Sequence, residues 1–389
     1  MSAIVIVAAK RTPIGAFQGQ LAAFSAPELG AVALRSTLME AGLDPHAVDE
    51  VYMGCVLSAG LGQAPARQAA LKAGIPHAVG CTTVNKVCGS GMKAVMLGHD
   101  TIRAGNASAV LAGGMECMSN APHLLSRSVS ARRLGNLELL DHLMRDGLEN
   151  PGDGKAMGFF AERCVDQFGF TREEQDRWAA ESVKRALKAM DLADFVDEIA
   201  PIDPIDASRI DRDETPLKCN LAKISTLKPV FRPENGTVTA GNSSSISDGA
   251  AALLLMDDAQ AVRLGIPPLA RIVGFASHAQ APEDFPTAPI AAIQQLYEKL
   301  GWHNEDVDLY EINEAFAAVT LAAITALRLD PEKVNVNGGA CALGHPIGAS
   351  GARIIVTLAH ALKRRGLRRG IAALCIGGGE ATAIALERS

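Results

Sequence analysis

Continuous apolar runs alternate with amphipathic stretches along most of this chain. The runs at residues 109–112 and 372–376 contain no charged side chain, and each is followed by glycine. Such runs are typical of strands covered on both faces, and residues 3–9 are a third example. Short glycine-punctuated connections join them to stretches with helical spacing. The alternation predicts an α/β fold with helices on both sides of a sheet.

The pattern repeats within the chain. Three pairs of segments match, in the same order, at offsets of 259, 260 and 264 residues. They are residues 41–55 with 300–314, Ser90-Gly91 with Ser350-Gly351, and residues 108–116 with 372–380. Matches at nearly one offset predict two halves built on one plan.

A long insert interrupts the first half. The closing strand of the second half, within residues 379–389, has its counterpart in residues 249–258. We therefore expect three units. They are an N-terminal half of residues 1–118 plus 249–268, a loop domain of residues 119–248, and a C-terminal half of residues 269–389.

Two helices stand out in this scheme. Residues 171–190 begin with a capping box, Thr171 and Glu174, and carry one apolar stripe. The stripe consists of Ala179, Val183, Ala186, Leu187 and Met190. Residues 314–327 are apolar nearly all round yet too short to cross a bilayer, so we expect a helix buried between two layers.

Bulk composition excludes several classes of protein. The 389 residues are 48% hydrophobic and carry a net charge of −6, which argues against a nucleic-acid binder. No apolar run reaches the roughly 18 residues of a membrane span. Eight cysteines without a CxxC pair indicate reduced thiols in a cytoplasmic setting and argue against a structural zinc site.

Cys88 is the first candidate for chemistry. It stands directly before Gly89-Ser90-Gly91, where a helical pattern starts. A helix N-terminus lowers a thiol pKa, and the flanking glycines let a carbonyl approach the backbone. A free cysteine is also an ordinary small core residue. The same stretch also fits a dinucleotide-binding G-x-G-x-x-A, but the preceding Asn85 and Lys86 are polar, and no acidic residue follows a strand about 20 residues on without an intervening Gly-Gly.

Three further polar positions follow in the second half. His345 lies in a glycine-rich loop just before a helix expected from about Ser350, where a surface histidine is the alternative. Cys375 ends an apolar strand before three glycines, whose free N–H groups suit an oxyanion, although a buried strand cysteine is the plainer explanation. Asn313 follows another strand and could simply cap the next helix. If the halves pack about a pseudo-twofold axis, all of these residues face one cleft.

Six segments, in order, resemble the signatures of the thiolase family, and together they span nearly the whole chain. They are NKVCGSGMKAV (85–95), AGGMECMSNAP (112–122), GTVTAGNSSSISDGAA (236–251), NEAFAA (313–318), NGGACALGHPIGASGAR (337–353) and CIGGGEATA (375–383). The likeness is greatest to acetyl-CoA acetyltransferases. It implies a five-layered α/β/α/β/α fold of two pseudo-repeated halves with an inserted loop domain.

The resemblance also implies roles for residues. Cys88 resembles the nucleophile that carries the acyl group, and His345 the residue that activates it and polarises a carbonyl. Cys375 resembles the acid/base for the α-proton. Asn313 resembles the residue that holds a water, which with His345 makes one oxyanion hole. The N–H groups of Cys88 and Gly377 resemble those that form the family's second oxyanion hole.

Coenzyme A thioesters are the implied substrates, with no metal, no tightly bound cofactor and ping-pong kinetics. Ser244 resembles the family's pantetheine-contacting serine. The expected tunnel lining is Leu148, Met157, Leu227, Phe231, Ala315 and Phe316. Where acetyl-specific members carry His-Met-Gly, this chain has Ala156-Met157-Gly158, which puts strict acetyl specificity in doubt. The family also forms homodimers and homotetramers, so an oligomer is expected.

Several functions remain open at this level. The first is acetyl-CoA C-acetyltransferase, which condenses two acetyl-CoA to acetoacetyl-CoA and CoA. The second is a 3-ketoacyl-CoA thiolase of broader chain length acting in fatty-acid degradation. A 3-ketoacyl synthase would pair its nucleophile with two histidines, or with a histidine and an asparagine, so Cys375 disfavours it. A non-catalytic lipid-binding protein would not need all four polar positions.

Overall fold

The computed structural model describes residues 3–127, 136–204 and 208–388. Within this part of the chain, ten strands form one continuous sheet. The first half contributes β1 (Ile4–Arg11), β2 (Gly15–Ala16), β3 (Glu50–Gly54), β4 (Gly80–Val84), β5 (Ala109–Cys117) and β8 (Ser247–Asp257). The second half contributes β9 (Ala270–Ala279), β10 (Leu309–Ile312), β11 (Arg369–Ile376) and β12 (Glu380–Glu387).

Strand pairing confirms the repeat. In the first half the order is β1-β8-β5-β3-β4, antiparallel at the first two junctions and parallel at the last two. The second half repeats it as β9-β12-β11-β10, with the same two antiparallel junctions and then a parallel one. In place of a fifth strand, Val334 makes a single parallel bridge to Tyr310. The halves join where β1 pairs with β9.

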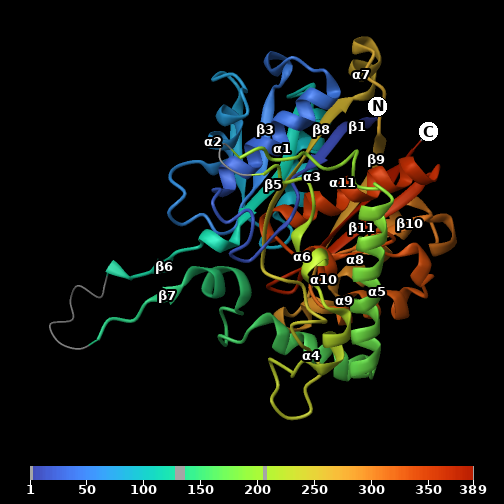
Figure 1. The fold of residues 1–389 in the computed structure, drawn as a ribbon. Coiled ribbons are helices and arrows are strands. Elements are labelled where there is room, and N and C mark those ends of the chain that lie inside the picture. Colours follow the sequence, from blue (N-terminus) through green and yellow to red (C-terminus); the bar gives the residue numbers. More distant parts are fainter. Residues whose placement is uncertain (1–2, 128–135, 205–207, 389) are drawn as a thin grey trace.

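The helices form the other three layers (Figure 1). Helices α1 (Ala26–Ala41) and α2 (Pro65–Lys72) cover the outer face of the first half. Helices α8 (Ala288–Leu300) and α9 (Ala317–Leu327) cover the outer face of the second half. Between the halves lie α3 (Ser90–Arg103) and α11 (Ile347–Arg365), which share one apolar core with strands of both. The two halves and the five layers match the expected architecture.

The fully buried helix is not the one expected. Every residue of α11 from Ile347 to Leu362 is buried, whereas α9 lies on the outer side beneath the insert and is partly exposed near its end. The expectation that residues 314–327 lie between two layers is therefore only partly correct. Helix α11 also begins at Ile347, three residues before the expected start.

The insert lies mostly over the second half. Its helices are α4 (Met157–Phe168), α5 (Arg172–Asp191) and α6 (Glu214–Lys218), and α4 and α5 both contact α9. The capping box that starts α5 is present as expected, with Thr171 Oγ1 accepting from the Glu174 N–H at 3.1 Å. A two-stranded hairpin of β6 (His123–Leu124) and β7 (Leu140–Asp141) reaches out from the body (Figure 1).

Short elements complete the described chain. The remaining helices are α7 (Asp258–Leu264) and α10 (Ala340–Leu343), with a π-helix at Met144–Leu148. Short 3₁₀ helices lie at Pro45–Ala47, Met118–Asn120, Leu221–Thr226, Pro282–Thr287, Asn304–Asp306 and Pro331–Lys333.

A buried ion cluster fastens the insert to β1. Arg11 Nε lies 2.6 Å from Glu198 Oε1, and its Nη1 and Nη2 lie 2.7 and 3.0 Å from the two oxygens of Asp213. All three side chains are buried, and Asp213 also accepts the N–H of Ile14 at 2.8 Å. Charges removed from water in this way need every partner in place.

We expect Asp213→Ala to lower the free energy of unfolding by about 3–5 kcal/mol, because it leaves the Arg11 guanidinium buried with half its partners. Urea denaturation measures this difference. The control is Lys72→Ala, which breaks an exposed pair with Glu28 at 3.5 Å and should cost no more than about 1 kcal/mol. Equal effects in the two variants would contradict the assigned role of the cluster.

Candidate active site

Cys88 sits on a strained turn at the start of α3. The preceding Val87 has φ of 46°, a left-handed conformation that is unfavourable for a β-branched residue. Ser90 holds the turn, since its Oγ accepts from the Lys86 N–H at 2.8 Å and donates to the Val87 carbonyl at 2.6 Å. Strain maintained by such bonds is common where a side chain must be presented for chemistry.

Two backbone N–H groups point at the Cys88 sulfur, one from Gly377 and one from Cys88 itself. These are the two groups that the family resemblance assigns to an oxyanion hole. Burial nevertheless raises the pKa of the Cys88 thiol to about 11, and the carboxylate of Glu116 adds to the rise. The expectation that the helix N-terminus lowers this pKa is therefore wrong, because desolvation outweighs the two hydrogen bonds. Cys88 at rest is a thiol and needs a base.

The raised pKa predicts how Cys88 reacts with iodoacetamide. The thiolate fraction, and with it the alkylation rate, should rise about tenfold per pH unit from pH 7 to 10 without a plateau. Mass spectrometry of the peptide that contains Cys88 measures the rate separately from the other thiols. A rate already level at pH 7 would show that the thiol is acidic.

His345 is the candidate for this base, and it precedes α11, whose first turns pack against Gly91 at the start of α3. The ring is buried, with Nδ1 2.6 Å from Ser350 Oγ and 3.5 Å from Asn313 Nδ2. Its Nε2 has no hydrogen-bond partner among the described residues. Burial, with a further contribution from the positive charge of Arg353, lowers the pKa of His345 to about 3. The imidazole is therefore neutral near pH 7, as a base must be, and it is not on the surface.

Cys375 lies one residue before the end of β11 and is almost fully buried. Burial is the main cause that raises its pKa well above the usual range, and the charge of the neighbouring Cys88 sulfur is the second. Asn313 follows β10, the parallel neighbour of β11, and its N–H donates to the Ala373 carbonyl at 3.0 Å. The structure thus links Cys88 to Cys375 and Gly377, and Asn313 to His345.

A cavity of about 470 Å³ opens onto this site, with His345 in its wall. Five of the six residues expected to line a pantetheine tunnel do line it, as does Ser244. They are Leu148, Met157, Phe231, Ala315 and Phe316. Leu227 is not in this lining and is 37% exposed, so it lies outside the cavity wall.

The two cysteines pack against different groups of the residues that line the cavity, although neither cysteine is itself in the lining. Cys375 packs in the apolar cluster that includes Met157 and Phe316. Cys88 packs against a second cluster that includes Met118 and Ile347. All four of these neighbours also line the cavity. The two thiols therefore lie behind two different parts of the cavity lining.

The sequence reasoning missed several residues of the cavity wall. Met118, Met144, Val230, Ala240, Ser243, Ser245, Ile246 and Ile347 line it as well. The serine run around Ser244 was a usable signal for its two neighbours. Nothing in the local pattern marked Met118 or Met144, which reach the cavity from a 3₁₀ turn and a π-helix.

Ala156 and Gly158 show why the insert sequence matters here. Ala156 lines the cavity and precedes the first residue of α4, without a side-chain hydrogen bond to the helix. Gly158 packs so closely on Phe231 that a Cβ would lie 2.2 Å from the ring. The glycine is therefore needed to seat this aromatic wall, whereas Ala156 leaves the cavity apolar at a position where the family resemblance implies an imidazole.

Glu116 was also missed as a site residue. Its carboxylate accepts the N–H groups of Val56, Leu57 and Gly348 at 3.0, 3.1 and 2.9 Å. It thereby fastens the loop after β3 to the first turn of α11, near the loop that carries His345. Burial raises the pKa of Glu116 to about 7 despite these three bonds.

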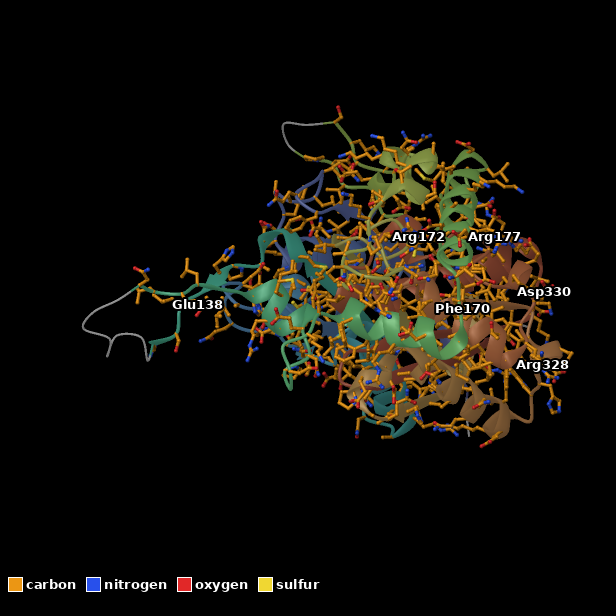
Figure 2. All side chains as sticks on the ribbon, turned by 90° about the horizontal axis from the view of Figure 1, so that it is seen from below. Glu138, Phe170, Arg172, Arg177, Arg328 and Asp330 are labelled. Atoms are coloured by element: carbon orange, nitrogen blue, oxygen red, sulfur yellow. The ribbon has the colours of Figure 1, made fainter. Side chains whose placement is uncertain are left out.

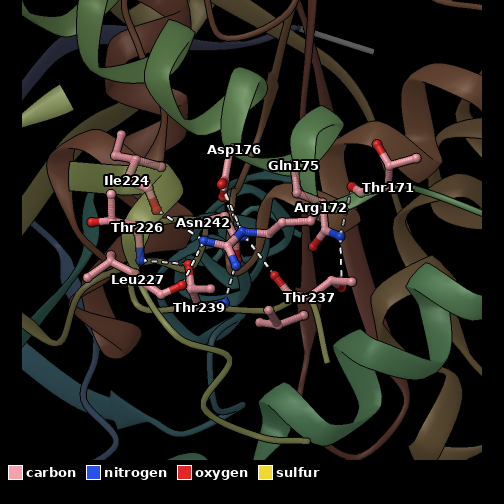
Figure 3. A network of polar contacts seen from close by, with 12 residues as sticks. Thr171, Arg172, Gln175, Asp176, Ile224, Thr226, Leu227, Thr237, Thr239 and Asn242 are labelled. Carbon is pink, nitrogen blue, oxygen red and sulfur yellow. Dashed lines mark hydrogen bonds and ion pairs between the residues drawn. The ribbon is translucent and has the colours of Figure 1, made fainter. Parts of the chain in front are cut away.

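A polar network holds the segments that lead into the cavity (Figure 3). Arg172 Nε lies 2.8 Å from Asp176, and its Nη2 donates to the carbonyls of Ile224 and Leu227 at 3.1 and 2.8 Å. Asp176 also accepts from Asn242 at 2.9 Å, next to the serine run. Figure 2 places Arg172 and Phe170 on the body, well away from Glu138 on the arm. The start of α5 is thus tied to the segment that carries Ser243, Ser244 and Ser245 of the cavity wall.

Two kinds of feature are not found in the described part of the chain. No group of three or more His, Cys, Asp or Glu side chains there could hold a metal ion. No helix there is long and apolar enough to cross a membrane.

Comparisons with known proteins agree with this geometry. The thiolase N-terminal domain matches residues 4–259 and the thiolase C-terminal domain matches residues 266–388. The acetyl-CoA acetyltransferase of Schizosaccharomyces pombe is 47% identical over 99% of this chain and 98% of its own. That of Pseudomonas aeruginosa is 48% identical over the full length of both chains. The solved structure of Acat5 thiolase from Ascaris suum, in complex with coenzyme A, has a TM-score of 0.95 at 41% identity over the whole of both chains. The chain belongs to the thiolase family.

Proposed function

We propose that this acyltransferase of the thiolase family is an acetyl-CoA C-acetyltransferase, which joins two acetyl-CoA into acetoacetyl-CoA and CoA and catalyses the reverse thiolysis. The observation that carries the proposal is the pair of backbone N–H groups at the Cys88 sulfur, which also interacts with the second thiol, of Cys375, at a site whose cavity has the neutral His345 in its wall. Relatives of nearly identical length are named acetyl-CoA acetyltransferases, which favours this function over a thiolase of broader chain length.

In the first half-reaction Cys88 becomes acetylated. His345 takes the proton of the Cys88 thiol, and the thiolate attacks the carbonyl carbon of acetyl-CoA. The N–H groups of Cys88 and Gly377 stabilise the negative oxygen of the tetrahedral intermediate. The bond to the sulfur of CoA then breaks, and His345 returns the proton to that sulfur. One thioester is exchanged for another, so little free energy is lost.

In the second half-reaction a carbon–carbon bond forms. The Cys375 thiol first gives its proton to His345, and the resulting thiolate takes a proton from the methyl group of a second acetyl-CoA. Protonated His345 and Asn313, through a water, stabilise the enolate oxygen. The enolate carbon attacks the acetyl group on Cys88, and the bond to Cys88 breaks. His345 then gives its proton to the Cys88 sulfur, which restores both thiols and the neutral imidazole.

The cavity is the proposed tunnel for the pantetheine arm of coenzyme A. Its wall is largely apolar, and Ser244 supplies a hydroxyl whose oxygen lies 3.1 Å from the Ala315 carbonyl. The related Ascaris suum thiolase was solved in complex with coenzyme A, which supports the assignment. Leu227, outside the wall, is proposed to contact the coenzyme only near the tunnel mouth.

We also propose a cytoplasmic homo-oligomer, a dimer or a tetramer. All eight cysteines are free, as a reducing compartment would keep them. Strand β4 lies at an edge of the sheet with one side unpaired in a single described chain. In the described part of the arm that leaves the body, four leucines are exposed, which are Leu125, Leu137, Leu139 and Leu140. Apolar side chains so far from a core suit contact with another subunit.

A chain-length series tests the substrate. With 3-ketoacyl-CoA esters of increasing length, thiolysis should be fastest for acetoacetyl-CoA and fall at least about tenfold by the eight-carbon ester, since one methylene in a shaped pocket is worth about 1–3 kcal/mol. Acetyl-CoA alone, without a malonyl donor, should also yield acetoacetyl-CoA. A rate that rises with chain length would support the broader thiolase instead, and a need for malonyl-CoA would support a synthase.

A further inference from the structure

Ser350 is a buried hydroxyl in the first turns of α11 to which no role has been given. We propose that Ser350 is a positioning residue that keeps the proton of neutral His345 on Nδ1 and so leaves Nε2 free to accept a proton. The inference rests on the proposed function, in which His345 takes the proton of Cys88. The inference says which of the two ring nitrogens of His345 can accept that proton.

Two hydrogen bonds meet at this hydroxyl. Ser350 Oγ lies 2.9 Å from the Pro346 carbonyl and 2.6 Å from His345 Nδ1. The carbonyl can only accept, so a bond to it uses the single proton of the hydroxyl. Serine in a helix commonly donates to the carbonyl four residues earlier in this way. The oxygen can then only accept a hydrogen bond from His345, so Nδ1 must carry the hydrogen.

The other half of the chain contains a similar arrangement with unambiguous roles. Ser90 matches Ser350 in the repeat and is the first residue of α3, whereas Ser350 is the fourth residue of α11. Its oxygen accepts from the Lys86 backbone N–H and donates to the Val87 carbonyl. A backbone N–H cannot accept and a carbonyl cannot donate, so Ser90 must be both acceptor and donor.

One substitution between the halves explains why Ser350 is available to His345. At the same offset of 260 residues, Lys86 corresponds to Pro346. Proline has no N–H, so the donor that occupies Ser90 is missing in the second half. The Nδ1–H of His345 takes its place, at 2.6 Å. Ser350 is both acceptor and donor, like Ser90. Because Pro346 has no N–H to donate, the Ser350 oxygen is free to accept from His345.

The surroundings of the other nitrogen agree. Nε2 is buried and has no partner among the described residues, and a buried N–H without an acceptor is rarer than an unfilled acceptor. The Asn313 amide nitrogen, at 3.5 Å from Nδ1, is at the outer limit of a hydrogen bond and does not compete with Ser350. When Nε2 accepts the proton of Cys88, Ser350 still accepts from Nδ1, and the proton later passes to the departing CoA sulfur.

Neutron diffraction from crystals of the perdeuterated wild-type protein near pH 8 tests the proton position directly. We expect a deuteron on His345 Nδ1 directed at Ser350, and the Ser350 deuteron directed at Pro346. A deuteron on Nε2 with none on Nδ1 would overturn the inference. This result does not depend on activity. Failure of the wild-type enzyme to condense acetyl-CoA would refute the proposed function and leave the proton position to be read all the same.

Kinetics of three variants provide the second test. Ser350→Ala should lower kcat about 10- to 100-fold, with KM for acetoacetyl-CoA changed less than about twofold, because only the base is affected. Ser350→Thr, which keeps the hydroxyl, should recover most of the rate. Thr382→Val removes another buried hydroxyl, one without a partner, and should keep full activity. Full activity in Ser350→Ala, or an equal loss in the Thr382 control, would contradict the assignment.

Discussion

Replacing Cys88 with alanine should abolish acyl transfer in both directions, by at least about 10⁴-fold, since no other group can take over the covalent step. The variant should still bind acyl-CoA, because the residues that line the cavity are unchanged. Intact-mass measurement after mixing with acetyl-CoA should show one acetyl group per subunit in the wild type and none in the variant. A thiol exchange assay, which follows labelled CoA into acetyl-CoA, should show no turnover.

Cys219→Ala is the matched control for this experiment. Its thiol is also half-buried and has its pKa raised by burial, but it lies in the insert and does not line the cavity. We expect the control to retain acetylation and turnover. Acetylation that persists in the Cys88 variant would show that another residue carries the acyl group, and it would remove the basis of the proposed mechanism.

Local patterns in the sequence predicted much of the fold because the two halves obey the same local rules. Apolar runs without charges become strands buried on both faces, and the matching glycine turns place them in the same order. The bridge between Val334 and Tyr310 stands in the second half where β4 stands in the first. Cys88 and His345 stood out for a similar reason, since small residues around each leave room for a ligand.

Tertiary partners explain what the sequence could not show. Helix α11 contains Arg353, Thr357 and His360, so its sequence pattern is that of an amphipathic helix with one face exposed to solvent. Each of these side chains is buried against a group far away in the chain: Glu311 for Arg353, Glu198 for Thr357, and the Ala9 carbonyl for His360. No local signal reports such partners. Helix α9 has no polar face, yet the insert covers only part of it.

The acidity of Cys88 was mispredicted for the same kind of reason. The position before a helix is visible in the sequence and favours a low pKa, but desolvation depends on chain segments 260 to 290 residues away, such as Ile376, which packs closely on Gly89. The roles of Ser350 and Glu116 likewise depend on distances between residues that no pattern brings together. Reasoning from local sequence patterns therefore finds reactive residues more easily than it finds the residues that orient them or shift their pKa.

Replacing Cys375 with alanine should separate the two half-reactions. Acetylation of Cys88 needs only His345 and the N–H groups of Cys88 and Gly377, so the variant should acquire one acetyl group per subunit and still exchange CoA, at a rate within about tenfold of the wild type. Condensation should fall by at least about 10³-fold, because the methyl proton of the second acetyl-CoA has no base to receive it. Thiolysis should fall equally, since the same thiol must protonate the departing enolate.

The control for this second prediction is Cys164→Ala, which removes another buried thiol. The Cys164 sulfur donates to the Ala318 carbonyl at 3.9 Å, and its charge contributes to the raised pKa of Cys375. Because it raises that pKa only as a minor cause, its loss should leave condensation intact or slightly faster. Equal loss of CoA exchange and condensation in the Cys375 variant would mean that this thiol supports the structure of the site instead of moving a proton. Loss of condensation alone, with exchange preserved, is the pattern expected when one sulfur holds the acetyl group and the other moves the proton.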